Sequence, residues 1–510
     1  MRCDMSKKYI GITIGPIFDT IQDASSPAAM WFTSFLFSDL TRRICDKISG
    51  EPGFGNVEIY SPYYAEEVDI YQDGVGKFHD RILFSIDTEE VDYESRLRKL
   101  LKEVKVETAV YFENLPRYEK ENTEKFLEEY LQIHYLIQDA VEENIILDLS
   151  DRLSALELIK TFPKDNSQNP ILKLLLGYAE GKNEFIKSSN LYRNVRDKKQ
   201  LEQDGKIRTI ETIAQTACND GLKLSRYFAV VNSDGDRMGK VLELLGNEEV
   251  NQFSKKLFEH ASSAAQKIKE FGGMTIYAGG DDLLFLAPIL GTDGKSIFSL
   301  CNTLRNDFAK KMKEGNDIGP TLSFGISIQY YKYPLYEAME VSRRMLDVAK
   351  SGKKNAVAVN LQKHSGQSLG LKISNENLDK IDQFLQLGKN EIKDSQTLHS
   401  MIYSVEEFKG LYDQMFHNAQ EEWRNLREKE RGAEKFVQIW SHLFDNSSQE
   451  KYMDYVKETA EFFYRECVVK EVVLAETLGE NEGDSDDMTR MTASLLRLKK
   501  FFEEKGGEED

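Results

Sequence analysis

Two short apolar runs, 274–278 and 283–287, stand only four residues apart, and this spacing restricts the fold more than any other feature of the chain. The four residues between the runs are Gly279, Gly280, Asp281 and Asp282. Glycine reaches positive φ without a Cβ clash, so the pattern predicts a tight hairpin between two strands. An adjacent Asp pair at a turn is ordinarily only solvated, and its meaning here depends on the surrounding residues.

Strands and helices alternate around this hairpin. The pattern predicts a strand at 226–233, a helix with apolar spacing over 250–268, the two hairpin strands, a helix at 294–313, a strand at 321–328, a helix opened by Pro334 and a strand at 355–360. The βαββαβ order, followed by one more helix and strand, predicts a ferredoxin-like sheet whose third strand lies between the first and second. Asp234, at the end of the first strand, is then expected at the same sheet edge as the hairpin turn.

The N-terminal region repeats this order less clearly. Strands are expected at 8–16, 57–62, 81–87 and 107–112, with helices at 26–48 and near 93–104. Ser26 and Pro27 suit the N-cap and first turn of the first of these helices. Gly15 and Pro16 occupy the place that corresponds to Asp234, and the corresponding hairpin has no acidic pair. We therefore expect this copy to be catalytically inactive.

The sequence accordingly predicts an α+β protein with two ferredoxin-like units. We expect an N-terminal unit at 1–115, a mainly helical linker at 116–224, a second and catalytic unit at 225–365, and a helical C-terminal domain at 366–510 with an acidic tail. All 10 prolines lie at or before Pro334, and long amphipathic stretches follow, which supports the helical C-terminal assignment.

Composition excludes several classes of protein. The formal charge of −19 argues against a free-standing nucleic-acid binder. No apolar run approaches the ~20 residues of a membrane span, and the N-terminus lacks the apolar segment of a signal peptide, so a cytoplasmic location is expected. The cysteines (Cys3, Cys45, Cys218, Cys301 and Cys467) stand singly, which predicts no zinc site. His79-Asp80 lacks the further histidines that a metal phosphohydrolase needs, so no nuclease activity is expected from it.

Three carboxylates, those of Asp234, Asp281 and Asp282, are expected to crowd one sheet edge. Such crowding is unfavourable unless a cation neutralises it, and oxygen ligands favour Mg²⁺ or Mn²⁺. A pair of such ions activates a ribose 3′-hydroxyl and stabilises a pyrophosphate leaving group, which indicates nucleotidyl transfer. The residues expected to contact the nucleotide are Gly235, Asp236, Arg237, Gly279 and Gly280 in the two turns, and Lys350, Lys353 and Lys354 at the end of the helix after Pro334.

The ordered motifs SDGDRMGK (233–240), YAGGDDLLF (277–285), SFGIS (323–327) and AKSGKKN (349–355) resemble the cyclase-like polymerase palm of the large subunit of type III CRISPR effector complexes. The resemblance covers about 225–362. The segment 9–115 is similar to the first, inactive palm of the III-B form of that subunit. Members often begin with an HD nuclease domain and carry a four-cysteine zinc element, and this chain is expected to lack both.

This resemblance implies that two palms hold two nucleotides, with metal at Asp234, Asp281 and Asp282. It implies conversion of ATP into a second messenger when the guide RNA of the complex pairs with target RNA, with the other subunits as partners. The product is expected to be either cyclic oligoadenylate or AMP joined to S-adenosylmethionine. The first helix has no Lys or Arg over 23–31 to hold an acceptor triphosphate, whereas Asp19, Asp23 and Asp39 suit a cationic acceptor.

Two alternatives stay open. The chain is a structural subunit of the same RNA-guided complex whose palm no longer turns over, or it is a free-standing cyclase of the GGDEF type. Intact Asp234, Asp281 and Asp282 argue against the first, and the Asp pair in place of Glu-Phe argues against the second.

Overall fold

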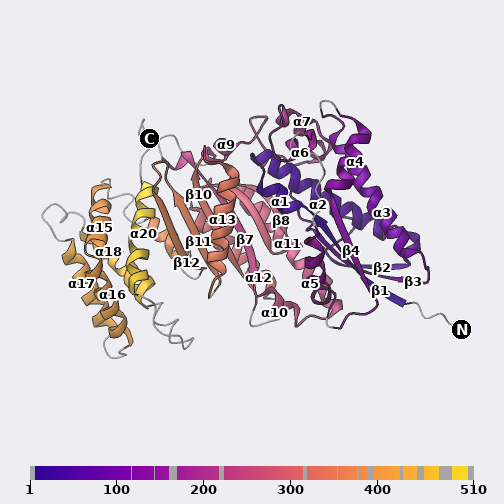
Figure 1. Cartoon of the computed structure of the whole chain (residues 1–510). Helices are drawn as coiled ribbons and strands as arrows, with labels where there is room; N and C mark the ends of the chain where they lie inside the picture. The colour runs from indigo at the N-terminus through magenta and orange to yellow at the C-terminus, as the bar shows by residue number, and fades with distance from the viewer. Residues whose placement is uncertain are drawn as a thin grey trace.

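The computed structural model describes residues 6–115, 118–142, 144–159, 169–216, 223–313, 319–352, 354–375, 378–386, 395–424, 429–444, 453–469 and 485–503. Two main sheets follow one another across the molecule, and helices of the C-terminal region form one end of it (Figure 1). The α+β class predicted from the sequence is confirmed. Among the described residues, no helix has both the length and the apolar character needed to cross a membrane.

A four-stranded antiparallel sheet of order β2-β3-β1-β4 forms the base of the N-terminal half. Its strands are β1 (Ser6–Gly15), β2 (Asn56–Ser61), β3 (Arg81–Thr88) and β4 (Gln132–Gln138). The predicted helices are α2 (Pro27–Ser49) and α3 (Tyr93–Glu107). The Ser26 side chain accepts a hydrogen bond from the Ala29 N–H, as its prediction as N-cap requires. The third strand lies between the first and second, which is the order that a βαββαβ chain produces.

The fourth strand was predicted wrongly. Residues 107–112 continue α3 as a 3-10 helix, η2 (Thr108–Phe112), and β4 instead follows α4 (Lys120–Tyr130). The β-branched and aromatic residues there suggested a strand, but Ala109, Tyr111 and Phe112 are buried against the helices, and tertiary packing outweighs β propensity. The first sheet therefore extends beyond the predicted boundary at residue 115.

The second sheet has six strands in the order β12-β11-β10-β7-β9-β8. They are β7 (Tyr227–Asp236), β8 (Met274–Gly279), β9 (Asp282–Pro288), β10 (Thr321–Tyr330), β11 (Ala356–Gln362) and β12 (Ser368–Ser374). The helices α11 (Asn247–Phe271), α12 (Ile297–Met312) and α13 (Leu335–Lys350) connect them. All strands predicted here are present, and β12 adds one that was missed, beyond the predicted boundary at 365.

The two halves of the chain share a hydrophobic core, and this packing fixes the position of the β8–β9 hairpin. Met274, Ile276 and Leu286 of the hairpin belong to the same cluster of buried side chains as Trp31 and Phe35 of α2. The aromatic side chains of α2 are fully buried. The turn between β8 and β9 consequently lies where the N-terminal half meets the second sheet.

The opposite face of the second sheet is covered by α11, α12 and the C-terminal helices. The C-terminal helices are α14 (Leu378–Gln386), α15 (Ser395–Glu407), α16 (Lys409–Arg424), α17 (Lys429–Leu443), α18 (Met453–Phe463) and α20 (Ser485–Glu503). Trp440 and Tyr412 are completely buried among them. The described part of the C-terminal region is thus helical after β12, as its amphipathic pattern predicts.

Candidate active site

The strand order of the second sheet brings the three predicted carboxylates together. β7 pairs antiparallel with β9, and a two-residue turn joins β8 to β9 with Gly280 at a φ of +69°. One carboxylate oxygen from each of Asp234, Asp281 and Asp282 lies within 4.8 Å of the other two. An all-oxygen set of three carboxylates at this spacing fits Mg²⁺ or Mn²⁺.

Gly235 allows the β7 backbone to approach the hairpin closely. Its N–H donates a hydrogen bond to Asp281 Oδ2 at 3.2 Å. A Cβ atom on Gly235 would lie 2.4 Å from the same oxygen and 2.8 Å from Met238 Cγ, so a larger residue would displace Asp281. The glycine therefore positions one of the candidate ligands.

The acidic cluster is electrostatically unfavourable as it stands. Burial raises the pKa of Asp281 above its usual value. Asp282 keeps contact with solvent, yet the protein crowded around its carboxylate raises its pKa well above the usual range, and the charges of Asp281 and Asp80 add to this effect. A bound divalent cation would relieve this repulsion, which is a second reason to regard the cluster as a cation site.

Lys350, the last residue of α13, reaches this cluster. Its ammonium group forms an ion pair with Asp234 and donates a hydrogen bond to the Gly235 carbonyl at 3.2 Å. Burial, and then the charge of Lys354, lowers the pKa of Lys350 to about 8, while the contact with Asp234 acts in the opposite direction. Lys354 is thus also close to the site, and Lys353 lies outside the described residues.

The strand β7 is longer than the strand predicted at 226–233, so Asp236 lies in the strand and not in the turn that follows it. The strand continues two residues beyond Asp234, and Asp236 is completely buried. Its carboxylate accepts hydrogen bonds from Thr321 Oγ1 (2.8 Å), Ser323 Oγ (2.8 Å) and the Asn355 N–H (2.9 Å). Asp236 therefore ties β7 to β10 and to the residue that precedes β11, and its carboxylate is held in these contacts. Arg237 is exposed, with a φ of +61°, ahead of α10 (Met238–Leu242).

Asp282→Asn is expected to stabilise the cation-free chain near neutral pH. Because the folded-state pKa of Asp282 is raised, ionisation above about pH 4 costs folding free energy, and the cost grows as pH rises toward the folded-state value. The amide cannot ionise and escapes this cost. Thermal melting in EDTA should show a more stable variant at about pH 7 and a smaller difference at about pH 4. A variant less stable than the wild type at neutral pH would contradict this electrostatic account.

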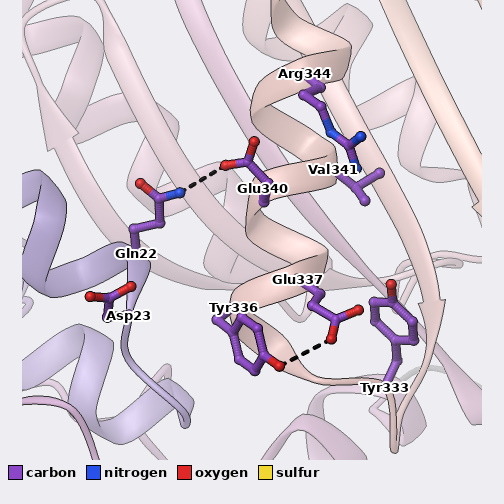
Figure 2. A pocket seen from close by; sticks show the side chains of 8 residues that line it. All are labelled: Gln22, Asp23, Tyr333, Tyr336, Glu337, Glu340, Val341 and Arg344. Atoms are coloured by element: carbon purple, nitrogen blue, oxygen red, sulfur yellow. Dashed lines mark hydrogen bonds between the residues drawn. The ribbon is translucent and has the colours of Figure 1, made fainter.

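A pocket lies along the N-terminal part of α13, on the side that faces α1 (Ile17–Gln22) of the N-terminal half (Figure 2). Its volume is about 340 Å³, and it is lined by Gln22, Asp23, Tyr333, Tyr336, Glu337, Glu340, Val341 and Arg344. Gln22 Nε2 donates to Glu340 across the gap at 2.8 Å, and the Tyr336 hydroxyl donates to Glu337 at 3.0 Å. We call this hollow the α1/α13 pocket.

The α1/α13 pocket includes only one of the three acids predicted for an acceptor pocket. Asp23 lines it and Asp19 does not. Asp39 is buried elsewhere, where it accepts hydrogen bonds from Tyr71 at 2.8 Å and from Tyr111, and pairs with Arg43 at 3.0 Å. The acids that α13 contributes to the pocket, Glu337 and Glu340, were not predicted from the sequence.

Comparison with known proteins places this site in a family of domains. Residues 227–358 match the model of the Cas10/Cmr2 second palm domain. The chain is also similar to the CRISPR system Cmr subunit Cmr2 of Pyrococcus furiosus, with 29% identity over 207 residues. That match covers 35% of this chain and 23% of the relative, so it spans about a quarter of the relative's length. The predicted resemblance to the type III palm is confirmed for this central domain.

Solved structures show a similar fold over most of the chain. The apo Csm1-Csm4 cassette aligns with 99% of this chain and 71% of its own, at a TM-score of 0.52 and 13% identity. The apo state of a type III-B Cmr-beta complex aligns with 80% of this chain and 76% of its own, at a TM-score of 0.51 and 12% identity. At these identities the likeness concerns the fold, and it includes both sheets.

Proposed function

We propose that this chain is the large subunit of a type III CRISPR effector complex and that it transfers an adenylyl group from ATP. The observation that carries the proposal is the convergence of Asp234, Asp281 and Asp282, with Lys350, at one edge of a second-palm domain. The other subunits, a guide RNA and an activating target RNA would be its partners in the cytoplasm. The similarity to a Cmr subunit supports that assignment.

In this reaction the 3′-oxygen of an acceptor ribose attacks the α-phosphorus of ATP. The bond from that phosphorus to the bridging oxygen breaks, pyrophosphate leaves, and the hydroxyl proton passes to solvent. Asp234, Asp281 and Asp282 would hold Mg²⁺ or Mn²⁺, and such an ion would lower the pKa of the hydroxyl and neutralise the leaving pyrophosphate. Lys350 would release Asp234 and turn to the phosphates, since a nucleotide brings negative charge to the same place.

One experiment distinguishes this proposal from its two alternatives, a structural subunit and a free-standing cyclase. The chain, expressed with the other subunits, is purified and incubated with ATP, with and without target RNA, and the products are identified by mass spectrometry. Synthesis only with target RNA supports the proposal, and absence of any nucleotide product supports a structural subunit. Activity of the isolated chain without RNA or partners would support a free-standing cyclase.

The α1/α13 pocket bears on the identity of the acceptor. Its three carboxylates, from Asp23, Glu337 and Glu340, outnumber its single arginine, and this charge disfavours a triphosphate there. Tyr333 and Tyr336 offer aromatic faces to which an organic cation binds favourably. This composition favours S-adenosylmethionine, with its sulfonium and amino groups, over ATP as acceptor. The pocket volume of about 340 Å³ lies within the range of small-ligand sites.

We therefore expect an activated complex that receives both ATP and S-adenosylmethionine to join AMP to the latter. Asp23→Asn should reduce this conjugate about tenfold, because the variant loses one carboxylate facing the cation. Asp19→Asn is the matched control, since Asp19 lies in α1, which Asp23 caps, and does not line the pocket. Abundant cyclic oligoadenylate with no incorporation of the methionine derivative would exclude the conjugate.

A further inference from the structure

Two of the three carboxylates project from one face of the second sheet, the face that α13 and the N-terminal half cover. Leu284 and Leu286 of β9 belong to the cluster of buried side chains that includes the core of the N-terminal half, and strand alternation puts Asp282 on their side. On β7, Asp234 pairs with Lys350 of α13. We call this side of the sheet the α13 face.

A β-bulge turns Tyr277 onto the α13 face. Thr275 of β8 pairs with Phe285, and Tyr277 pairs with Leu284, so Ile276 is an extra residue in β8. In a regular strand Tyr277 would share the opposite face with Thr275. Instead, Ile276 and Tyr277 both pack against the cluster of the α13 face. Bulges are common beside active sites, where they redirect a side chain.

The Tyr277 hydroxyl lies at the hairpin turn. A Cβ atom on Gly279 would lie 2.5 Å from Tyr277 Cζ and closer still to the hydroxyl oxygen, so the phenol lies directly against this glycine. Gly279 pairs with Asp282 at the end of the hairpin. The bulge therefore brings a hydroxyl group to the turn that bears the acidic pair, on the same face as Asp282.

This hydroxyl is available to a ligand. Tyr277 is half-buried, and within the described ranges its hydroxyl makes no hydrogen bond. Buried phenols usually find a partner, as Tyr71 and Tyr111 do by donating to Asp39. Burial, and then the nearby carboxylate charges, hold the pKa of Tyr277 well above its usual value. The hydroxyl thus keeps its proton and can donate.

We infer that the Tyr277 hydroxyl contacts the nucleotide and donates a hydrogen bond to a phosphate oxygen of ATP at the cation site. The inference rests on the proposed function, because it concerns the same site. Phosphate oxygens are charged acceptors, and hydrogen bonds to charged groups are stronger than those between neutral groups. A phenol supplies this bond without a positive charge, so it would not compete with the cation held by the three carboxylates.

Binding of an uncleavable ATP analogue to the full chain tests this contact. The analogue α,β-methylene ATP keeps the phosphate oxygens and resists the proposed bond cleavage, so calorimetry with Mn²⁺ measures affinity without turnover. Tyr277→Phe should weaken binding of the analogue by about tenfold, because it removes only the hydroxyl. Inorganic triphosphate, which has no nucleoside, should show the same loss. Binding of Mn²⁺ alone should not change.

Tyr9→Phe is the matched control. Tyr9 is also a half-buried tyrosine of a strand, but it lies in β1 and packs against a separate hydrophobic cluster. This variant should bind the analogue as the wild type does. Without ligand, Tyr277→Phe should melt no lower than the wild type, since its hydroxyl has no partner among the residues that the structure describes.

The outcomes separate the inference from the proposed function. Wild-type affinity of Tyr277→Phe for the analogue would overturn the phosphate contact and leave the acidic trio standing. A loss with the analogue but not with triphosphate would put the hydroxyl against the nucleoside, which also overturns the inference. A lower melting temperature of ligand-free Tyr277→Phe would give the hydroxyl a role in the fold and would overturn it too. Failure of the wild-type chain to bind the analogue would overturn the proposed function itself.

Discussion

Replacing both Asp281 and Asp282 with Asn is expected to abolish nucleotide synthesis by the assembled complex. The variant keeps the size of both side chains and removes two of the three charges that would hold the cation. Losing a metal-centred electrostatic contribution typically costs ~10²-fold or more in rate. Mass spectrometry of products, after incubation with ATP and target RNA, measures this loss directly. The turn lies at the surface end of the hairpin, so the complex should still assemble.

Asp347→Asn provides the matched control for this experiment. Asp347 is exposed on α13, three residues before Lys350, and it is not part of the acidic cluster. Its loss changes the charge near the site by one unit without removing a candidate ligand. Synthesis should therefore stay near the wild-type rate. Residual synthesis above about one per cent in the double variant would move the reaction to other residues.

The acidic trio could be predicted from the sequence because strand order alone determines it. Once 226–233 is a first strand and 274–287 a hairpin, the antiparallel pairing of β7 with β9 brings Asp234 to the turn. No knowledge of side-chain packing is needed for that step. The same reasoning predicted that α13 ends at this edge, and Lys350 indeed contacts Asp234.

The residues that sequence reasoning missed depend on contacts between distant segments. The bridge from Gly76 to Tyr277, for example, joins the N-terminal half to β8 just before the hairpin turn. The donors that hold the Asp236 carboxylate likewise come from β10 and from the residue that precedes β11. A pattern along the chain contains neither kind of information.

The errors in the fold have a similar origin. Residues 107–112 have the composition of a strand, yet they form the end of α3 and a 3-10 helix that packs against α3 and α4. Conversely, β12 alternates buried Leu369, Leu371 and Ile373 with exposed residues, a pattern the sequence did contain. This strand was not predicted because the strand at 355–360 was taken as the last strand of the second ferredoxin-like unit.

Gly325→Ala is expected to destabilise the second palm strongly, because this glycine sets the distance between β10 and α13. A Cβ atom there would lie 2.2 Å from both Leu346 N and Ser342 O, which are backbone atoms of the helix. No side-chain rotation relieves such a clash, so the helix itself must shift. Overpacking typically costs about 1–3 kcal/mol in the free energy of unfolding, and a clash with backbone atoms should place this variant at the upper end of that range. Chemical denaturation of the purified chain measures that cost.

The same shift should reach the candidate active site, since α13 bears Lys350 and also lines the α1/α13 pocket. Asn232 of β7 donates to Ser342 Oγ at 2.6 Å, and this bond would be strained with the helix. Gly370→Ala is the matched control, because Gly370 lies in β12 of the same sheet with no atom within 4 Å of an added Cβ. That control should change stability by less than about 0.5 kcal/mol. If both variants unfold at the same denaturant concentration, α13 is not held against β10 by the close approach at Gly325, and the placement of Lys350 needs another cause.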